Sequence, residues 1–301
     1  MLLLVSAITF FLVNLAPGGP SSLMRIDATP EQREALTRRF GLDRPVPVRY
    51  VDWLAGAVHG DLGTSLLTQE PVSNRILDRL PNTLVLSALA LGLSVLIGIP
   101  MGVLSALSRG RVSDYILAAF SLIGLSVPAF WLGIMLILTF SVNLQVLPSS
   151  GLATTGSAFD IGDRIAHIIM PMVVLSTTVL PNVVRFTRSA MLDVLGQDYV
   201  RTATAKGLSR QVVTYVHALR NALVPVISVI GTLIPRLVGG AVVTEAVFGW
   251  PGMGRLAVEA ANGRDYPLVV GITVVVAMVV VITSLIVDLA YTWVDPRIRL
   301  T

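Results

Sequence analysis

The sequence predicts an all-α polytopic membrane protein with about six transmembrane helices. Of its 301 residues, 54% are hydrophobic and only 13% are charged, and the mean hydropathy is +0.78. Soluble domains carry about 25% charged residues, so this composition is typical of a membrane protein. The chain has no cysteine, which excludes disulfides, thiolate metal sites and a cysteine nucleophile.

The predicted spans are uncharged windows long enough for the roughly 20 apolar residues that cross a bilayer core. Four windows meet this length, at residues 82–108, 115–142, 165–184 and 266–287. A fifth, 221–244, is interrupted only by Arg236. Residues 1–16 are uncharged but about 6 Å short of a span. They lack a basic n-region and a small-residue cleavage site, so we expect a first transmembrane helix with a clipped or mis-assigned start.

The basic residues predict the orientation of the spans. Ten of them lie in the loops at 107–114, 185–220 and 293–301, against three in the short loops of the opposite side. The positive-inside rule therefore predicts cytoplasmic N- and C-termini. The same rule explains the net charge of +4, so a nucleic-acid partner is not expected. The longer segment 17–82 is expected to be a small extracytoplasmic subdomain, with a helix over residues 29–41.

The cytoplasmic segment between the fourth and fifth spans has helical patterning. Gly207 separates a first helix, predicted over 197–206, from a second helix that Ser209 caps. The apolar residues of the second helix share one face: Val212, Val216, Leu219 and Leu223. The pattern predicts a helix–turn–helix elbow. Such an elbow either lies on anionic lipid or docks into another protein, and of these two readings periodicity alone favours the lipid surface.

Short motifs spread over nearly the whole chain carry a family resemblance. They are LAPGGP after the first helix, GDLGTS at 60–65, RLPNTL at 79–84, DYVRTATAKGL at 198–208, HALRNALVPV at 217–226, EAVFGWPGMGRL at 245–256, RDYP at 264–267 and DPRIR at 295–299. With these motifs the chain resembles the inner-membrane permease subunits, of the B type, of ABC importers for dipeptides, oligopeptides and nickel. The resemblance implies the type I ABC importer transmembrane fold.

In that family the elbow is an ATPase-coupling loop, here 197–220. The coupling residues that the resemblance implies are Arg201, Thr202, Ala203, Ala205, Lys206, Gly207, Leu208, Ser209 and Arg210. Arg201 to Ala203 stand where many importers have Glu-Ala-Ala, so a salt bridge to that glutamate is not carried over. The implied division is a first helix with an extracytoplasmic region (1–78), a transmembrane core (79–292) and a cytoplasmic tail (293–301).

The resemblance also implies partners and a location. The partners are a second, homologous permease subunit, two cytoplasmic ABC ATPase subunits that hold ATP and Mg²⁺, an extracytoplasmic substrate-binding protein, a peptide substrate and membrane lipid. The location is the bacterial cytoplasmic (inner) membrane. Import of nickel or of another small solute remains an alternative to peptide import.

The residues of the chain agree with a permease that is not itself an enzyme. No phosphate-binding Gly-x-x-x-x-Gly-Lys-Ser/Thr motif occurs, and the single lysine, Lys206, precedes its glycine. The three histidines are scattered, so no metal site, catalytic residue or cofactor is expected on this chain. An ion-coupled secondary transporter is a weaker alternative, because the acids within the spans, Glu245 and Asp288, lie near span ends.

Three residues are candidates for the translocation path or its gate: Arg236, Glu245 and Trp250. An arginine at a helix centre costs about 2.5–3.5 kcal/mol on insertion scales, so Arg236 is expected to face a water-filled path or the partner subunit. Glu245 has a structural hydrogen bond as its alternative role, and Trp250 a tight turn at the interface. Six prolines within the predicted spans permit kinks, at residues 100, 128, 171, 181, 225 and 235.

Overall fold

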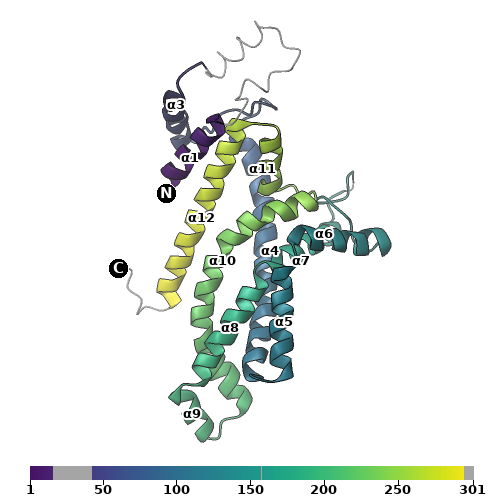
Figure 1. Cartoon of the computed structure of the whole chain (residues 1–301), viewed down its shortest axis with the longest axis vertical. Coiled ribbons are helices and arrows are strands. Elements are labelled where there is room, and N and C mark those ends of the chain that lie inside the picture. The colour runs from purple at the N-terminus through teal and green to yellow at the C-terminus, as the bar shows by residue number, and fades with distance from the viewer. Residues whose placement is uncertain (16–42, 157, 295–301) are drawn as a thin grey trace. The chain divides into compact units, whose positions relative to one another are not determined.

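The computed structural model describes residues 1–15, 43–156 and 158–294, and every named element in them is a helix (Figure 1). The chain forms two compact units. The first consists of Met1–Thr83 and Pro251–Val281, and the second of Leu84–Trp250 and Ile282–Thr301. The predicted division at residue 78 falls inside helix α4 (Val72–Leu107), and residues 251–281 pack with the N-terminal part of the chain.

Within the described residues, three helical segments are long and apolar enough to cross a membrane: Val72–Leu107, Val212–Gly239 and Tyr266–Val287. The last lies within α12 (Tyr266–Val294). A bent pair of helices makes a fourth segment if the pair is one span, and two shorter apolar helices cover Leu2–Leu15 and Ala129–Asn143. The polytopic helical class is therefore confirmed, whereas the number six stays a prediction.

The first unit contains α1 (Leu2–Leu15), α3 (Val46–Val58), the start of α4, α11 (Met253–Asn262) and most of α12. Phe10 of α1 lies 5.5 Å from the ring of Tyr50 and 6.1 Å from that of Trp53 in α3, centroid to centroid. A separate apolar cluster joins α4, α11 and α12 through Val72, Ile76, Met253, Leu256, Ala260, Leu268 and Ile272. The helix predicted over 29–41 lies outside the described residues.

Helix α4 begins ten residues before the apolar window that predicts it, at Val72 instead of Asn82. Its 36 residues measure about 54 Å at 1.5 Å per residue, against a bilayer core of roughly 30 Å. The added N-terminal stretch carries Arg75, Asp78 and Arg79. A hydropathy window stops at these charges, but a helix continues through them, so α4 is longer than a bilayer core requires.

The predicted single span over 115–142 is wrong, because the structure divides it into two helices. Helix α5 (Val112–Ser126) ends before Val127, and α6 (Ala129–Leu136) begins after Pro128 and continues into a π-helical turn, η2 (Ile137–Asn143). Val127 is extended, with φ −84° and ψ 122°. A proline disfavours the α conformation of the residue before it, which explains the break.

The predicted span over 165–184 is also two helices, α7 (Ile161–Thr177) and α8 (Leu180–Leu195), bent by 51°. Pro181 lies in the first turn of α8, where its missing N–H is tolerated. The carbonyl of Ser176, near the end of α7, accepts the N–H of Val179 over 3.0 Å. The hydroxyl of Ser94 in α4, which lies 2.8 Å from the carbonyl of Ala90, also approaches the Ser176 carbonyl to 3.1 Å. A contact from a neighbouring helix therefore accompanies the bend.

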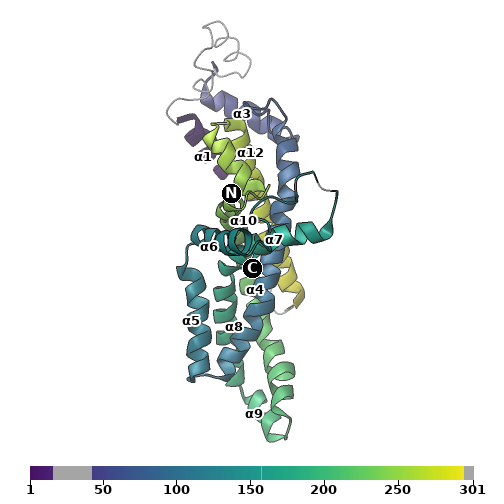
Figure 2. The ribbon, with the colours of Figure 1, turned by 90° about the vertical axis from the view of Figure 1, so that its right-hand side faces the viewer.

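The second unit is built around the crossing of α4 with α8. Gly98 and Gly102 lie one helical turn apart on α4 and face Val183, Val184 and Thr187 of α8. Glycines at this spacing let two backbones approach closely, as in membrane helix pairs. Helix α10 (Leu219–Val247) packs against α8, and α5 lies beside α4 and α8 (Figure 2). The core of this unit contains Leu86, Ala90, Ile168, Leu175, Val179, Val183, Leu233, Leu237, Ala241 and Trp250.

Candidate functional site

The elbow, residues 197–220, joins the ends of α8 and α10 (Figure 1). Its first helix, α9, runs from Asp198 to Ala205. Gly207 then turns the chain in the left-handed region, with φ +78°. The Ser209 hydroxyl accepts the N–H of Val212 over 3.4 Å at the start of the second helix. The predicted stop at Gly207 and start at Ser209 are thereby confirmed.

The inner side of the elbow packs on itself. Val200 and Ala203 of α9 are buried against Val213 of the returning helix. The amide of Asn221 donates to the hydroxyl of Tyr199 over 2.9 Å and braces α9 against α10. Ala203 therefore serves the elbow's own core, whereas Ala205 and Gly207 are exposed.

The returning helix turns a different face inward from the predicted one. Val212 and Val216, predicted to share the apolar face, are 38% and 55% exposed, whereas Val213 and Ala218 are buried. The reason is a π-helical stretch, η3 (Val212–Ala218). In a π-helix the hydrogen bonds run from i to i+5, so residues five apart share a face and the α-helical period gives the wrong set.

The outer side of the elbow combines positive charge with apolar surface. Three exposed cations lie along it: Arg201, Lys206 and Arg210. Exposed apolar and aromatic side chains accompany them: Leu208, Val212, Tyr215 and Val216. A surface of this kind is complementary to an apolar groove with an acidic rim. It also suits a layer of anionic headgroups, so the surface chemistry alone leaves both partners open.

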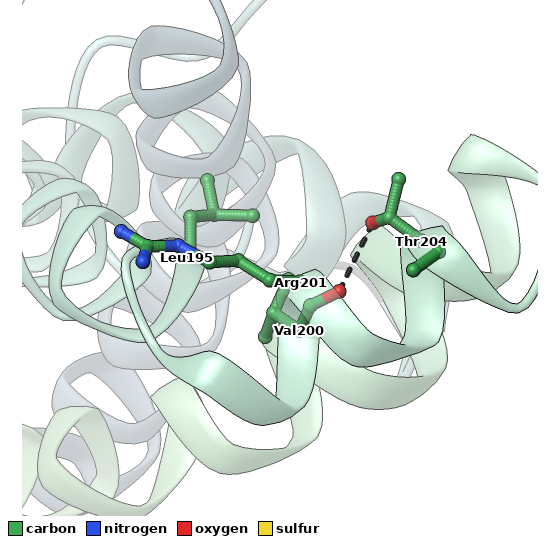
Figure 3. Close-up of a pocket in the computed structure, with 5 residues that line it drawn as sticks. Leu195, Val200, Arg201 and Thr204 are labelled. Atoms are coloured by element: carbon green, nitrogen blue, oxygen red, sulfur yellow. Dashed lines mark hydrogen bonds between the residues drawn. The ribbon is translucent and has the colours of Figure 1, made fainter.

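A pocket of about 390 Å³ opens on α9, lined by Leu195, Val200, Arg201, Thr204 and Ala205. Leu195 and Thr204 stand on opposite sides of it with Val200 between them (Figure 3). The Thr204 hydroxyl donates to the carbonyl of Val200 over 3.0 Å, so it is already engaged within the helix. The pocket is therefore mostly apolar, with Arg201 as its charged member.

An ion pair with a buried carboxylate, which the sequence did not reveal, lies in the middle of α8. Asp114, in the loop before the second predicted span, is 5% exposed. Its carboxylate accepts two hydrogen bonds from Arg188 of α8, Nε to Oδ1 over 2.9 Å and Nη2 to Oδ2 over 2.8 Å. Ser105 Oγ and the N–H of Gly110 donate to the same carboxylate over 2.5 Å and 3.1 Å. The hydrogen bonds from Arg188 and Ser105 hold the pKa of Asp114 well below its usual range.

Two of the gate candidates, Arg236 and Glu245, lie in the second half of α10, and Trp250 follows the end of that helix. Glu245 and Trp250 are fully buried, and the Trp250 N–H donates to the Glu245 carbonyl over 2.9 Å. The tight turn between them passes through Gly249, with φ +56°. Trp250 packs in the core of the second unit. Arg236 follows Pro235 within α10, and its side chain lies outside the described part of the structure.

Four of the sequence motifs meet in pairs within the first unit. Ser65 of GDLGTS donates to the buried Asp265 of RDYP, and the Leu66 N–H donates to the other oxygen of that carboxylate over 3.1 Å. Asn82 of RLPNTL donates to the Pro251 carbonyl over 2.8 Å. The neighbouring Thr83 hydroxyl accepts the N–H of Met253, the first residue of α11, over 2.7 Å. These motifs are therefore structural ties between distant segments.

This arrangement, bent apolar helices with a helical elbow at their end, defines a membrane-embedded subunit of a transporter. The chain belongs to the family of binding-protein-dependent transport system inner membrane components, whose model matches residues 98–300. The model for the N-terminal part of such components matches residues 1–87. The predicted class, the permease of a binding-protein-dependent transporter and not its ATPase, is therefore confirmed, as is its multi-pass inner-membrane location.

The relatives and the fold agree with this assignment. The chain is 46% identical to the oligopeptide transport system permease protein AppB of Bacillus subtilis (strain 168), over 99% of this chain and 95% of that protein. It is 40% identical to the dipeptide transport system permease protein DppB of Escherichia coli (strain K12), over 98% and 94%. Its fold matches a chain of the inward-facing MetNI methionine ABC transporter, with a TM-score of 0.60 over 73% of this chain and 96% of that chain, at 20% identity.

Proposed function

We propose that this chain is the permease subunit of an ATP-driven importer that moves dipeptides and oligopeptides across the inner membrane. The observation that carries the proposal is full-length similarity to relatives whose names specify oligopeptide and dipeptide transport. The structure agrees, because the bent pair of helices α7 and α8 provides a discontinuous helix of the kind that transport pathways use.

Energy enters this permease from partner subunits. Two cytoplasmic ATPases hold ATP and Mg²⁺ and dock on the elbow, where Arg201, Lys206 and Arg210 meet an acidic rim and Leu208 meets an apolar floor. Docking on a protein is favoured over docking on lipid because the elbow is braced by its own core and by the bond from Asn221 to Tyr199. An elbow braced in this way transmits force, which a helix lying on lipid does not require.

The other components complete the pathway. A second, homologous permease subunit closes the translocation path, an extracytoplasmic binding protein delivers the peptide, and Arg236 faces the seam between the two permeases. Glu245 and Trp250, buried together at the end of α10, form the gate. Opening this gate requires the turn at Gly249 to move, which releases the side chain of Trp250 from the core.

Uptake by the complete transporter tests this function. Radiolabelled dipeptide is offered to proteoliposomes that contain the permease, its partner subunits and the binding protein, with ATP inside or outside the vesicles. We expect accumulation that requires ATP on the cytoplasmic side and that unlabelled tripeptide reduces. Accumulation of nickel in place of peptide would reject the peptide substrate, and accumulation without ATP would reject the importer.

Cysteine labelling tests the proposed topology, since the parent chain contains no cysteine. Ser209→Cys and Thr68→Cys place single thiols at exposed positions of the elbow and of the loop before α4. We expect an impermeant maleimide to label Thr68→Cys in intact cells and Ser209→Cys only after the membrane is opened. The two variants are controls for each other, and the reverse pattern would invert the proposed orientation.

A further inference from the structure

The Asp114–Arg188 pair joins three helices at one point. Ser105 lies in the last turn of α4, Asp114 in the first turn of α5, and Arg188 in α8. The Asp114 carboxylate accepts hydrogen bonds from both other side chains, and the backbone of Gly110, turned by its φ of +76°, supplies a fourth. All acceptor positions of the buried carboxylate are thereby used, and two parallel bonds to a guanidinium fix the relative angle of the helices.

Helix α5 meets α8 at a second point, near the bend between α7 and α8. A Cβ built on Gly124 of α5 would lie 3.6 Å from Cγ of Pro181 and 3.6 Å from the carbonyl oxygen of Thr177. The two contacts, one at each end of α5, hold it along α8. Close packing of Gly98 and Gly102 of α4 on the same helix adds a third attachment.

The connection from this bundle to the elbow is short. Helix α8 ends at Leu195 and α9 begins at Asp198, so only Gly196 and Gln197 separate them. A displacement of α9 therefore reaches α8 with little slack. Whether the displacement also reaches α4 and α5 depends on how firmly these helices are attached to α8.

We propose that Asp114 and Arg188 are positioning residues that make α4, α5 and α8 move as one body when the elbow is displaced. The proposal rests on the proposed function of the elbow. Packed helices move in transporters by rigid-body rocking. Without the pair, α8 slides along α5, and the movement of the elbow does not reach α4 and α5.

Two variants test this role in the complete transporter in proteoliposomes. Asp114→Asn keeps the shape of the side chain but replaces one acceptor with a donor, opposite the donors of Arg188 and Gly110. Arg188→Lys keeps the charge but loses the paired geometry. We expect peptide uptake per ATP hydrolysed to fall at least about fivefold in both, the lower range of coupling between two sites, while the recovery of the intact complex stays within about twofold of the parent.

The controls lie on the same helix. Asp193→Asn and Arg185→Lys make the same chemical changes at exposed positions of α8 and should leave uptake per ATP unchanged. The proposal is overturned if uptake and ATP hydrolysis fall in parallel, if both variants match the parent, or if neither variant yields intact complex, which would show a role in folding. Failure of the elbow to bind ATPases appears differently, as loss of the ATPases from the purified complex.

Discussion

Reversal of two charges on the elbow, Lys206→Glu with Arg210→Glu, is expected to abolish uptake and to release the ATPase subunits while the permease stays in the membrane. Both side chains are exposed on the outer side of the elbow. Their reversal turns two attractions to an acidic groove into two repulsions, and like charges across an interface cost several kcal/mol. The fold is preserved because neither side chain belongs to the elbow's core of Val200, Ala203 and Val213.

The measurement is the amount of ATPase that co-purifies with tagged permease, together with uptake in the same preparation. A matched control reverses two exposed arginines of the loop between α4 and α5, Arg109→Glu with Arg111→Glu. If the elbow merely lies on anionic lipid, the two double variants should weaken the permease alike and both should keep the ATPases. Selective loss of ATPases from the elbow variant alone supports the docking surface.

Variants of Gly207 distinguish two reasons for a glycine at this position: the left-handed backbone conformation and a close approach of the partner subunit to the backbone. Nothing lies within 4 Å of a Cβ built on Gly207, so within this chain a side chain there meets only the strain of its φ of +78°. Asparagine adopts this left-handed conformation readily, whereas valine does not. If Gly207→Asn still loses the ATPases, the partner must approach the backbone closely, and if only Gly207→Val does, the turn itself is what matters.

The sequence predicted the ends of the helices in the elbow well, because capping residues near each end determine them. The glycine and the serine that end and begin the helices of the elbow are read within a few residues, and both were found. The buried face of the returning helix was not predicted, because no rule of spacing announces a π-helical stretch such as Val212–Ala218. The period of 3.6 residues was applied where the local period is longer.

The prolines within the predicted spans do not by themselves predict which helices break. Pro128 and Pro181 coincide with breaks, whereas Pro171 lies inside α7 and Pro225 and Pro235 lie inside α10 without ending their helices. A proline always frees a carbonyl, but neighbouring helices decide whether the helix continues. That decision depends on contacts such as the bond from Ser94 to Ser176, 82 residues away, which the sequence alone does not give.

The Asp114–Arg188 pair and the bond from Ser65 to Asp265 were missed for the same reason. Arg188 counted in the sequence only as a cytoplasmic positive charge, and its partner lies 74 residues away. A weak signal was present, since Asp114 is an acid directly before an uncharged span, where a charge must find a partner or water. The spacing of residues along the sequence could not identify Arg188 as the partner of Asp114.

Adding side chains at Gly102 is expected to disrupt the crossing of α4 with α8 in proportion to their size. A Cβ built on Gly102 would lie 2.6 Å from Cβ of Thr187 and 2.8 Å from the carbonyl oxygen of Val184. These atoms belong to a backbone and to a β-branched residue, neither of which can move aside easily. Gly102→Ala therefore forces the helices apart and is expected to lower the stability of the folded permease by about 1–3 kcal/mol. Gly102→Leu is expected to lower that stability further.

The matched control is Gly92, on the same helix, where nothing lies within 4 Å of the corresponding Cβ and the position is exposed. Alanine and leucine at Gly92 should leave the permease as stable as the parent, because the added side chains meet no other described residue of the chain. The measurement is the fraction of each variant that stays monodisperse in detergent after heating, read beside its uptake. If stability falls with side-chain size at Gly102 but stays constant at Gly92, the instability lies at the crossing. If stability stays constant at both positions, α4 and α8 tolerate separation.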